Sequence, residues 1–266
     1  MIAYLGTPEL AVGPLRALHA AGHEIGLVVS ASDKRRGRGS GLSPSPVKAA
    51  ALELGLAVSD DPDDLLGVDL ELGVVVAYGR ILRPHLLDAL PCVNLHFSLL
   101  PRWRGAAPVE RAILAGDTVT GVCLMEVTAG LDEGGVYASA TTAVDDKTLD
   151  ALRTELVDLG TGLLLDGLDN GLGEPTPQRG EVTYAAKLTA DERYLDRRLS
   201  AIELARIVRL GGAWTTFRDK RLKVIEAELV DGALRPIVVQ PEGRGPMAYD
   251  AWVNGARPEP DEWFGR

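Results

Sequence analysis

Short apolar runs of strand length, separated by helix-length segments, constrain the fold of this chain most. Residues 2–6, 25–30 and 72–78 are apolar at almost every position. Continuous runs of this kind are typical of parallel strands that helices cover on both faces. Segments long enough for helices lie between them, such as residues 45–54. We therefore expect an α/β domain with a mainly parallel sheet, and we place it at residues 1–178.

The C-terminal third has a different pattern. Two prolines shortly before residue 178 mark the end of the first domain, and we expect a linker at residues 179–199. The elements predicted beyond it are a helix, three short strands and a second helix, at residues 200–209, 214–217, 222–229, 234–240 and 246–255. Because so few elements give only a thin core, we predict a small β module over residues 200–266.

The stretch from Cys92 to Pro108 begins as a strand and carries polar side chains where a strand normally buries apolar ones. Alternate side chains of a strand share a face, so Asn94, His96 and Ser98 point one way together with Cys92. Packing explains the opposite, apolar face but does not explain the polar one. In α/β folds, ligands bind beyond the carboxyl ends of the strands. We therefore predict a functional site at the end of this strand.

An amide and an imidazole two residues apart can contact a single ligand atom. The Asn94 amide can stabilise an oxyanion as it develops, and the His96 imidazole can move a proton near neutral pH. A third group should orient the imidazole, and Asp132 in the glycine-rich loop 130–135 is the best candidate. The alternative is a buried polar cluster whose hydrogen bonds are satisfied internally. The spacing favours an active site for acyl-type chemistry.

Other kinds of chemistry have less support. Cys92 shares the polar face but lies about 13 Å from His96 by strand rise, too far for a Cys–His nucleophile pair. A metal site built on His96 and Asp132 has no third ligand at a recognisable spacing, so we expect no metal. The sequence also contains no glycine-rich dinucleotide-binding or phosphate-binding motif after a strand.

The net charge of −10 gives no general affinity for nucleic acid. Residues 179–266 are nearly neutral, with 15 Lys and Arg against 14 Asp and Glu. Local basic clusters must therefore attract any polyanion. The loop 33–43 is one such cluster, with Arg36 and Arg38 among its cations, and it either follows a phosphate backbone or is a solvated loop. The two arginines that flank Trp103 either bind an anionic ligand or form the rim of the site.

Compartment and assembly are less constrained by the sequence. Both cysteines lie in apolar, strand-like runs, which is typical of buried thiols in a reducing compartment. The N-terminus enters a strand at once and carries no basic region or long apolar segment, and no stretch of the sequence approaches the length of a membrane span. We expect a soluble, cytoplasmic and monomeric protein.

The motif Asn94-x-His96-x-Ser98-Leu-Leu-Pro-Arg-Trp-Arg-Gly-Ala-Ala-Pro108, followed by the Asp132 loop, closely resembles the folate-dependent formyltransferases. The resemblance covers nearly the whole chain. The Arg-Gly-Arg-Gly loop with Ser43-Pro-Ser-Pro-Val-Lys48 is similar to that of the members that act on tRNA. The resemblance implies a Rossmann-like formyltransferase domain and a shortened, OB-like C-terminal domain. It also implies formyl transfer from 10-formyltetrahydrofolate to the amino group of initiator methionyl-tRNA in translation initiation.

The resemblance also implies roles for individual residues. Asn94 would hold the developing oxyanion, His96 would handle the proton, and Asp132 would support His96. The folate-binding segment corresponds to Ser98, Leu99, Leu100 and Pro101, and the tRNA contacts to Arg36 and Arg38. A formyltransferase that acts on a small amine, such as an amino-sugar nucleotide, would need the same three catalytic residues but no basic loop. A non-catalytic folate-binding or RNA-binding relative would not need these three catalytic residues to be intact.

Three departures from the family stand out. The run 222–229 leads almost directly into residues 237–240, so the middle strands of the usual C-terminal barrel are missing. Leu210-Gly stands where Asn-Pro is usual, and Phe97 stands where many relatives have glycine. The first departure affects the expected binding of tRNA, and none affects the catalytic residues.

Overall fold

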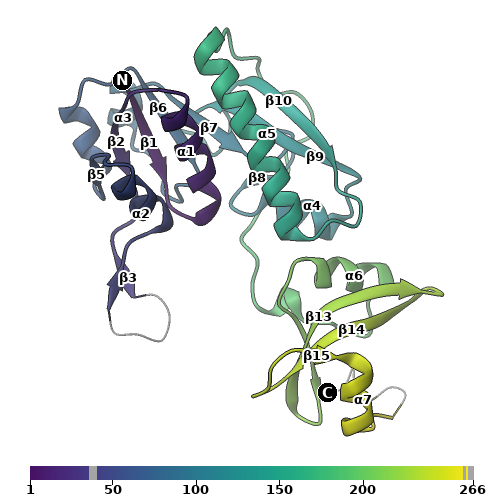
Figure 1. The fold of residues 1–266 in the computed structure, drawn as a ribbon. Helices are drawn as coiled ribbons and strands as arrows, with labels where there is room; N and C mark the ends of the chain where they lie inside the picture. The colour runs from purple at the N-terminus through teal and green to yellow at the C-terminus, as the bar shows by residue number, and fades with distance from the viewer. Residues whose placement is uncertain (36–40, 260–261, 263–266) are drawn as a thin grey trace. The chain divides into compact units, whose positions relative to one another are not determined.

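The computed structural model describes residues 1–35, 41–259 and 262, which form two compact units (Figure 1). Unit 1 contains Met1–Pro108, Val119–Ala143 and Arg153–Ala186. Unit 2 contains Val109–Thr118, Val144–Leu152 and Lys187–Arg266. Unit 1 thus includes the first residues of the segment predicted as a linker, and the predicted boundaries at residues 178 and 199 stay a prediction.

In the described part of the chain, unit 1 is built around a seven-stranded sheet with the order β10-β9-β7-β6-β1-β2-β5. Five adjacent strands of this sheet, β7, β6, β1, β2 and β5, run parallel to one another. Strand β9 runs antiparallel to both β7 and β10. The predicted, mainly parallel sheet is confirmed, with antiparallel pairing at one edge. The strands are Ile2–Gly6 (β1), Ile25–Val29 (β2), Val58–Ser59 (β5), Leu72–Val76 (β6), Cys92–His96 (β7), Val119–Glu126 (β9) and Val136–Ala143 (β10).

Local sequence determines where the helices begin. Ser45 caps α2 by accepting a hydrogen bond from the Lys48 backbone N–H (3.0 Å), and Pro46 follows as the first helical residue. Pro8 does not start a helix, because its backbone is extended and a 3-10 turn follows it before α1. The helices are Glu9–Ala11 (η1), Val12–Ala20 (α1), Pro46–Glu53 (α2), Pro62–Gly67 (η2), Pro84–Ala89 (α3), Pro108–Ala115 (α4) and Leu149–Asn170 (α5).

The two faces of the sheet pack against different elements. On one face, residues of β1, β2 and β6 form a buried cluster with residues of η2 and α3. On the other face, Leu95 and Val122 lie against α5, where a Cβ at Gly160 would come within 3.0 Å of the Val122 side chain and 3.3 Å of the Leu95 side chain. Because Asn94 and His96 alternate with Leu95 along β7, they project from the opposite face.

The basic loop predicted at residues 33–43 begins and ends in an antiparallel pair of short strands. These are Lys34–Arg35 (β3) and Leu42–Ser43 (β4). Arg36 and Arg38, the residues expected to contact tRNA, lie outside the described residues. Strand pairing therefore joins the two ends of the loop.

Unit 2 contains the predicted small β module. Its described residues form an antiparallel sheet with the order β12-β13-β14-β15. Helices α6 and α7 pack on one face of this sheet around a separate apolar core. The four strands are Ala213–Phe217, Lys220–Val230, Ala233–Pro241 and Met247–Ala248, and the helices are Ala201–Arg209 (α6) and Tyr249–Ala256 (α7), preceded by Asp191–Arg193 (η3). An OB fold has five strands, so four in the described part agree with the predicted shortening.

Two local signals build this module. Ser200 and Glu203 form a reciprocal capping box that starts α6. Asp231 and Gly232 both have positive φ and join β13 to β14 in a tight hairpin. None of the helices in the described ranges combines the length and the apolar character needed to cross a membrane.

Candidate active site

Strand β7 presents Asn94 and His96 two residues apart on the face opposite α5. His96 is 5% exposed, whereas Asn94 is only partly buried. Among the described residues, the Asn94 side-chain amide has no hydrogen-bond partner. The amide therefore has donors and an acceptor available to a ligand.

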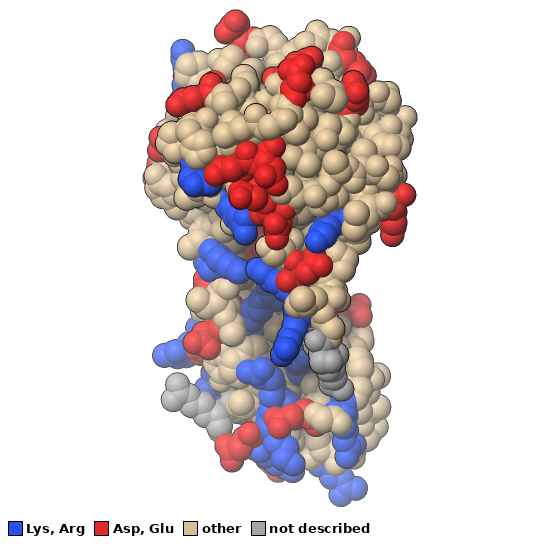
Figure 2. All heavy atoms as spheres, turned by 90° about the vertical axis from the view of Figure 1, so that its left-hand side faces the viewer, with Lys and Arg blue, Asp and Glu red and all other residues tan. Residues whose placement is uncertain are grey.

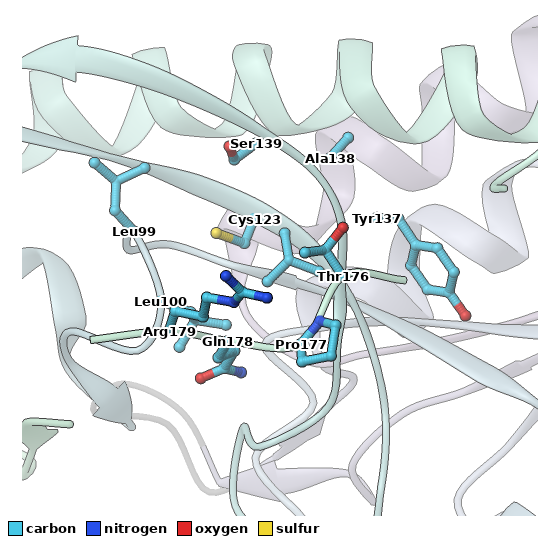
Figure 3. A pocket seen from close by; sticks show the side chains of 11 residues that line it. Leu99, Leu100, Cys123, Tyr137, Ala138, Ser139, Thr176, Pro177, Gln178 and Arg179 are labelled. Atoms are coloured by element: carbon cyan, nitrogen blue, oxygen red, sulfur yellow. The ribbon is translucent and has the colours of Figure 1, made fainter. Parts of the chain in front are cut away.

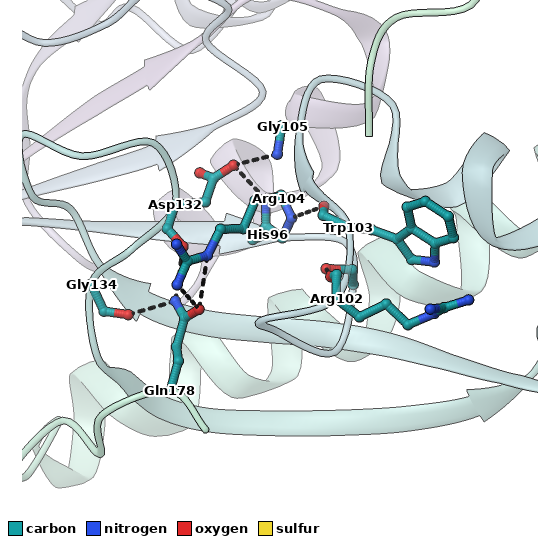
Figure 4. Close-up of polar contacts among 9 residues, drawn as sticks. His96, Arg102, Trp103, Arg104, Gly105, Asp132, Gly134 and Gln178 are labelled. Carbon is teal, nitrogen blue, oxygen red and sulfur yellow. Dashed lines mark hydrogen bonds and ion pairs between the residues drawn. The ribbon is translucent and has the colours of Figure 1, made fainter. Parts of the chain in front are cut away.

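The His96 imidazole lies between a backbone carbonyl and a carboxylate (Figure 4). Its Nε2 is 2.8 Å from the carbonyl oxygen of Trp103, and its Nδ1 is 3.5 Å from Oδ2 of Asp132. Because a carbonyl oxygen only accepts hydrogen bonds, Nε2 carries a proton in this arrangement. The structure thus brings together two of the three residues expected to act in catalysis, and their catalytic roles stay a prediction.

Asp132 is held in an uncommon backbone conformation. Its φ of 49° is left-handed, which is infrequent for a residue that is not glycine. Its Oδ2 accepts a hydrogen bond from the Gly105 backbone N–H (2.7 Å). The same loop passes so close to β9 that a Cβ at Gly134 would collide with the carbonyl group of Glu126. Contacts on both sides therefore fix the position of the Asp132 carboxylate.

A glutamine and an arginine complete this polar network (Figure 4). Gln178 Nε2 donates to the carbonyl oxygens of Asp132 and Gly134, each at 2.8 Å. Its Oε1 accepts from Arg104 Nε (3.1 Å) and Nη2 (2.7 Å), and Arg104 Nη1 is 3.4 Å from Glu133 Oε1. The sequence left the role of Arg104 open, and the structure shows a buried side chain bound to protein groups. Sequence reasoning missed Gln178 altogether.

An extended segment of residues 176–186, here named the strap, runs along the turn that follows β7. Thr183 accepts hydrogen bonds from two successive N–H groups of this turn, from Trp103 at its Oγ1 (2.9 Å) and from the next residue at its carbonyl (2.9 Å). A parallel pair of short strands follows, Arg104–Gly105 (β8) with Tyr184–Ala185 (β11). The strap therefore helps to place the Trp103 carbonyl that contacts the imidazole.

The predicted folate-binding segment divides into inward-facing and outward-facing residues. Ser98 is fully buried, and its Oγ donates to the carbonyl oxygen of Arg102 (2.5 Å). Leu99 and Leu100 instead line a cavity of about 450 Å³ (Figure 3). The other lining residues come from β9, β10 and the strap: Cys123, Val136, Tyr137, Ala138, Ser139, Thr176, Pro177, Gln178 and Arg179. The volume lies in the range of small-molecule sites, and Arg179 is the one charged side chain among the described residues that line it.

Burial makes the two thiols poor nucleophiles. Desolvation raises the pKa of Cys92 from 9.0 to about 11, and it also raises the pKa of Cys123. Cys92 Sγ contacts the carbonyl oxygen of Leu90 (3.4 Å), a structural use of the thiol. Within the described ranges, no group of three or more His, Cys, Asp or Glu side chains is arranged to hold a metal ion.

Unit 2 carries a second polar region of a different kind. Figure 2 shows lysine and arginine side chains in the lower part of the view, with aspartate and glutamate side chains among them. On the outer face of its sheet, the Arg221 guanidinium lies 4.2 Å from the centre of the Trp214 ring, and Lys223 pairs with Trp214 across the strands. Cations interleaved with an aromatic ring on one sheet face are typical of surfaces that bind nucleic acid.

Comparisons with known proteins agree on one family. Residues 1–168 match the family model described as Formyl transferase. A methionyl-tRNA formyltransferase of Jannaschia sp. (strain CCS1) is 39% identical over 296 aligned positions, which cover 97% of this chain and 98% of that relative. Because the alignment has more positions than the 266 residues of this chain, the relative contains segments that are absent here.

Two solved structures share the fold. The methionyl-tRNA formyltransferase from Clostridium thermocellum has a TM-score of 0.63 at 14% identity and covers 92% of this chain and 98% of that one. An N-formyltransferase from Helicobacter canadensis, in complex with folinic acid and dTDP-3-aminofucose, has a TM-score of 0.68 at 16% identity and covers 86% and 88%. At such low identity the likeness concerns the fold alone.

Proposed function

We propose that this chain, which belongs to the methionyl-tRNA formyltransferase family, transfers a formyl group from 10-formyltetrahydrofolate to the α-amino group of initiator methionyl-tRNA. The observation that carries the proposal is the His96–Asp132 pair beside the unpartnered Asn94 amide. It occurs in a chain that matches a methionyl-tRNA formyltransferase over 98% of that relative's length. The product is the formylated initiator tRNA of translation initiation.

The three side chains meet the two needs of acyl transfer to an amine, removal of a proton and stabilisation of an oxyanion. When bound, 10-formyltetrahydrofolate supplies the formyl group as the one-carbon donor. Asn94 donates an N–H to the formyl oxygen as that oxygen becomes negatively charged. With Nε2 engaged by the Trp103 carbonyl, His96 takes a proton from the attacking amine at Nδ1 and gives it to the folate nitrogen as the bond from that nitrogen to the formyl carbon breaks. Asp132, 3.5 Å from Nδ1, stabilises the charged imidazole that results.

The segment from Ser98 to Pro101 fits a folate in part. Leu99 and Leu100 offer apolar side chains at a cavity wall, against which a ring system can pack. Ser98 contributes through the shape of the turn, because its hydroxyl is already engaged with the Arg102 carbonyl. Pro101 is buried next to it and shapes the same turn. Leu99 and Leu100 are therefore the residues of this segment that we assign to folate contact.

Two regions provide the charge that a tRNA requires. The loop that carries Arg36 and Arg38 contributes cations between the paired strands β3 and β4. The face of unit 2 with Trp214, Arg221 and Lys223 contributes a ring and further cations. Because both regions engage phosphates, binding of tRNA weakens as the salt concentration rises.

The test of this function is a direct choice between acceptors. Purified protein and 10-formyltetrahydrofolate are incubated with methionyl-tRNA or with a dTDP-linked amino sugar, and the formylated product is identified by mass spectrometry. We expect formylmethionyl-tRNA and no formylated sugar. Formylation of the sugar nucleotide alone would identify a small-amine formyltransferase, and formylation of neither would reject the proposed activity.

A further inference from the structure

The Gln178 side chain uses its whole hydrogen-bonding capacity inside unit 1. Its NH₂ group donates to two carbonyl oxygens, those of Asp132 and Gly134, and its Oε1 accepts two N–H groups of Arg104. An amide side chain has two donors and two acceptor sites, so none remains for a ligand or for water. Gln178 is therefore a structural connection between the strap and the loop that carries Asp132.

The chemistry of its partners fixes which way the amide points. Arg104 can only donate hydrogen bonds, so the oxygen of Gln178 must face it, and the two carbonyl groups can only accept, so the nitrogen must face them. Arg104 is itself 9% exposed and also contacts Glu133. The donor end of Gln178 is thus held toward the Asp132 loop.

Asp132 needs support of this kind because its backbone is left-handed. A non-glycine residue in this conformation is strained and persists only where surrounding contacts over-determine it. Gln178 binds the carbonyl of Asp132 itself and that of Gly134, two residues further on. These contacts hold the loop so that Asp132 Oδ2 lies 2.7 Å from the Gly105 nitrogen and 3.5 Å from His96 Nδ1.

We propose that Gln178 is a positioning residue for formyl transfer, which acts by holding the Asp132 carboxylate against His96, with Arg104 holding Gln178 in turn. The inference rests on the proposed function, since it assigns Gln178 to that reaction. Although Gln178 lines the cavity, it has no free hydrogen-bonding group to offer either substrate in this role.

The substitution Gln178→Glu separates this role from simple packing. Glutamate has the same shape and keeps its contact with Arg104, but it places a carboxylate oxygen where the NH₂ group donated to two carbonyl oxygens. The resulting repulsion displaces the Asp132 loop. Because a misplacement of about 1 Å in an active site can cost about 100-fold in rate, we expect kcat to fall about 10-fold to 100-fold, with both KM values within about twofold of wild type.

Gln240→Glu is the matched control. Gln240 is the second glutamine of the chain, and its Nε2 also donates to a backbone carbonyl, that of Arg244 (2.9 Å), but in unit 2. At saturating tRNA, we expect its kcat to stay within about twofold of wild type. An equal loss of kcat in both variants would show that the added charge, and not the position of Asp132, causes the effect.

A double-mutant cycle tests whether Gln178 acts through Asp132. In an Asp132→Asn background the carboxylate is already lost, so Gln178→Glu should lower single-turnover rates by less than about twofold. If Gln178→Glu causes the same full loss in both backgrounds, it acts independently of Asp132 and the proposal is wrong. Gln178→Met, similar in size but unable to hydrogen bond, repeats the cycle if the glutamate variant folds poorly.

Hydrogen exchange provides a readout that does not require activity. The Gly105 N–H is bound to Asp132 Oδ2, so its exchange should be faster in Gln178→Glu than in wild type and unchanged in Gln240→Glu. Unchanged exchange at Gly105 would overturn the positioning role. If the wild-type protein formylates no methionyl-tRNA, the proposed function fails, whereas the exchange measurement still decides whether Gln178 positions Asp132.

Discussion

The two units present their polar groups in opposite ways. In unit 1, His96 and Asp132 are largely buried and bind defined protein atoms. In unit 2, Arg221 and Lys223 are exposed on the outer face of a sheet, with a tryptophan ring beside them. Buried and fully paired groups hold atoms in place, whereas exposed cations attract charge over a distance. We infer that unit 1 determines the rate of the chemical step and that unit 2 contributes to tRNA affinity.

Removing the buried pair should have the largest effect. We expect His96→Ala and Asp132→Asn each to lower kcat by about 10²–10⁴-fold, the usual contribution of general acid–base groups. The fold should survive, because each change removes one polar group and leaves the sheet intact. Formylation of methionyl-tRNA at saturating substrate, together with the melting temperature, checks both statements. Wild-type rates in either variant would remove that residue from the mechanism.

Asn94→Ala should come next. Loss of a single oxyanion donor lowers kcat by about 10²–10³-fold. Since the amide acts on charge that develops in the transition state, KM for 10-formyltetrahydrofolate should change little. A rise in KM with an unchanged kcat would instead identify Asn94 as a ground-state binding group.

The thiol of Cys92 should show the effect of burial in unit 1 directly. At pH 8, a thiol with a pKa of about 11 has a thiolate fraction about 100-fold smaller than that of a thiol with a pKa of 9.0. Alkylation of Cys92 by iodoacetamide should therefore be slower by about that factor. The raised pKa of Cys92 also makes the free energy of unfolding depend on pH. The contribution of this thiol to the free energy of unfolding is fully present below pH 9 and is lost as the pH rises from 9 to about 11, because the thiol ionises first in the unfolded chain. Rapid alkylation of the folded protein at pH 8 would contradict the burial.

Changes in the exposed face of unit 2 should have the smallest effect on rate. We expect Trp214→Ala and Arg221→Ala to raise KM for tRNA about fivefold to tenfold while kcat stays within twofold. For Arg221→Ala, the slope of log affinity against log salt concentration should decrease in magnitude by about one, which corresponds to the loss of one phosphate contact. Arg38→Ala, in the basic loop, should act in the same direction without changing folate affinity.

An exposed arginine of unit 1 provides the control for these charge changes. Arg16 on α1 pairs with Glu53 (2.5 Å), so Arg16→Ala removes one positive charge that is not part of the proposed contact face. Its KM for tRNA should match that of wild type. If Arg16→Ala raises KM as much as Arg221→Ala, the cations act only through net charge, and the assignment of tRNA affinity to this face of unit 2 fails.

Much of unit 1 follows from patterns that repeat along the chain. Apolar runs predict β1, β2 and β6, and strand alternation predicts that Asn94 and His96 share a face. Both patterns are local, since each of these strands is buried at almost every position. The same reasoning predicts β12, β13, β14, α6 and α7 of unit 2, but it begins α7 three residues early and so misses the short strand β15.

The contacts that complete the site do not follow from such patterns. The Trp103 carbonyl, Thr183 and Gln178 act through backbone groups, a hydroxyl or an amide. They lie in irregular or extended chain, where no sequence periodicity predicts a contact. Trp103 and Thr183 are 80 residues apart, and only the folded chain shows that they meet. The pairing of β3 with β4 was missed for a similar reason, because short exposed strands have no apolar alternation.

The position of the strap in the chain also sets the order in which the site can form during synthesis. The turn after β7 leaves the ribosome long before the strap does, and synthesis proceeds from the N-terminus at about 5–20 residues per second. Until residue 178 has emerged, the Gln178 side chain cannot bind the carbonyl groups of the Asp132 loop, and until Thr183 follows, two N–H groups of the turn lack the partner that they have in the folded chain. A nascent chain that has completed the whole seven-stranded sheet is therefore still without an assembled active site.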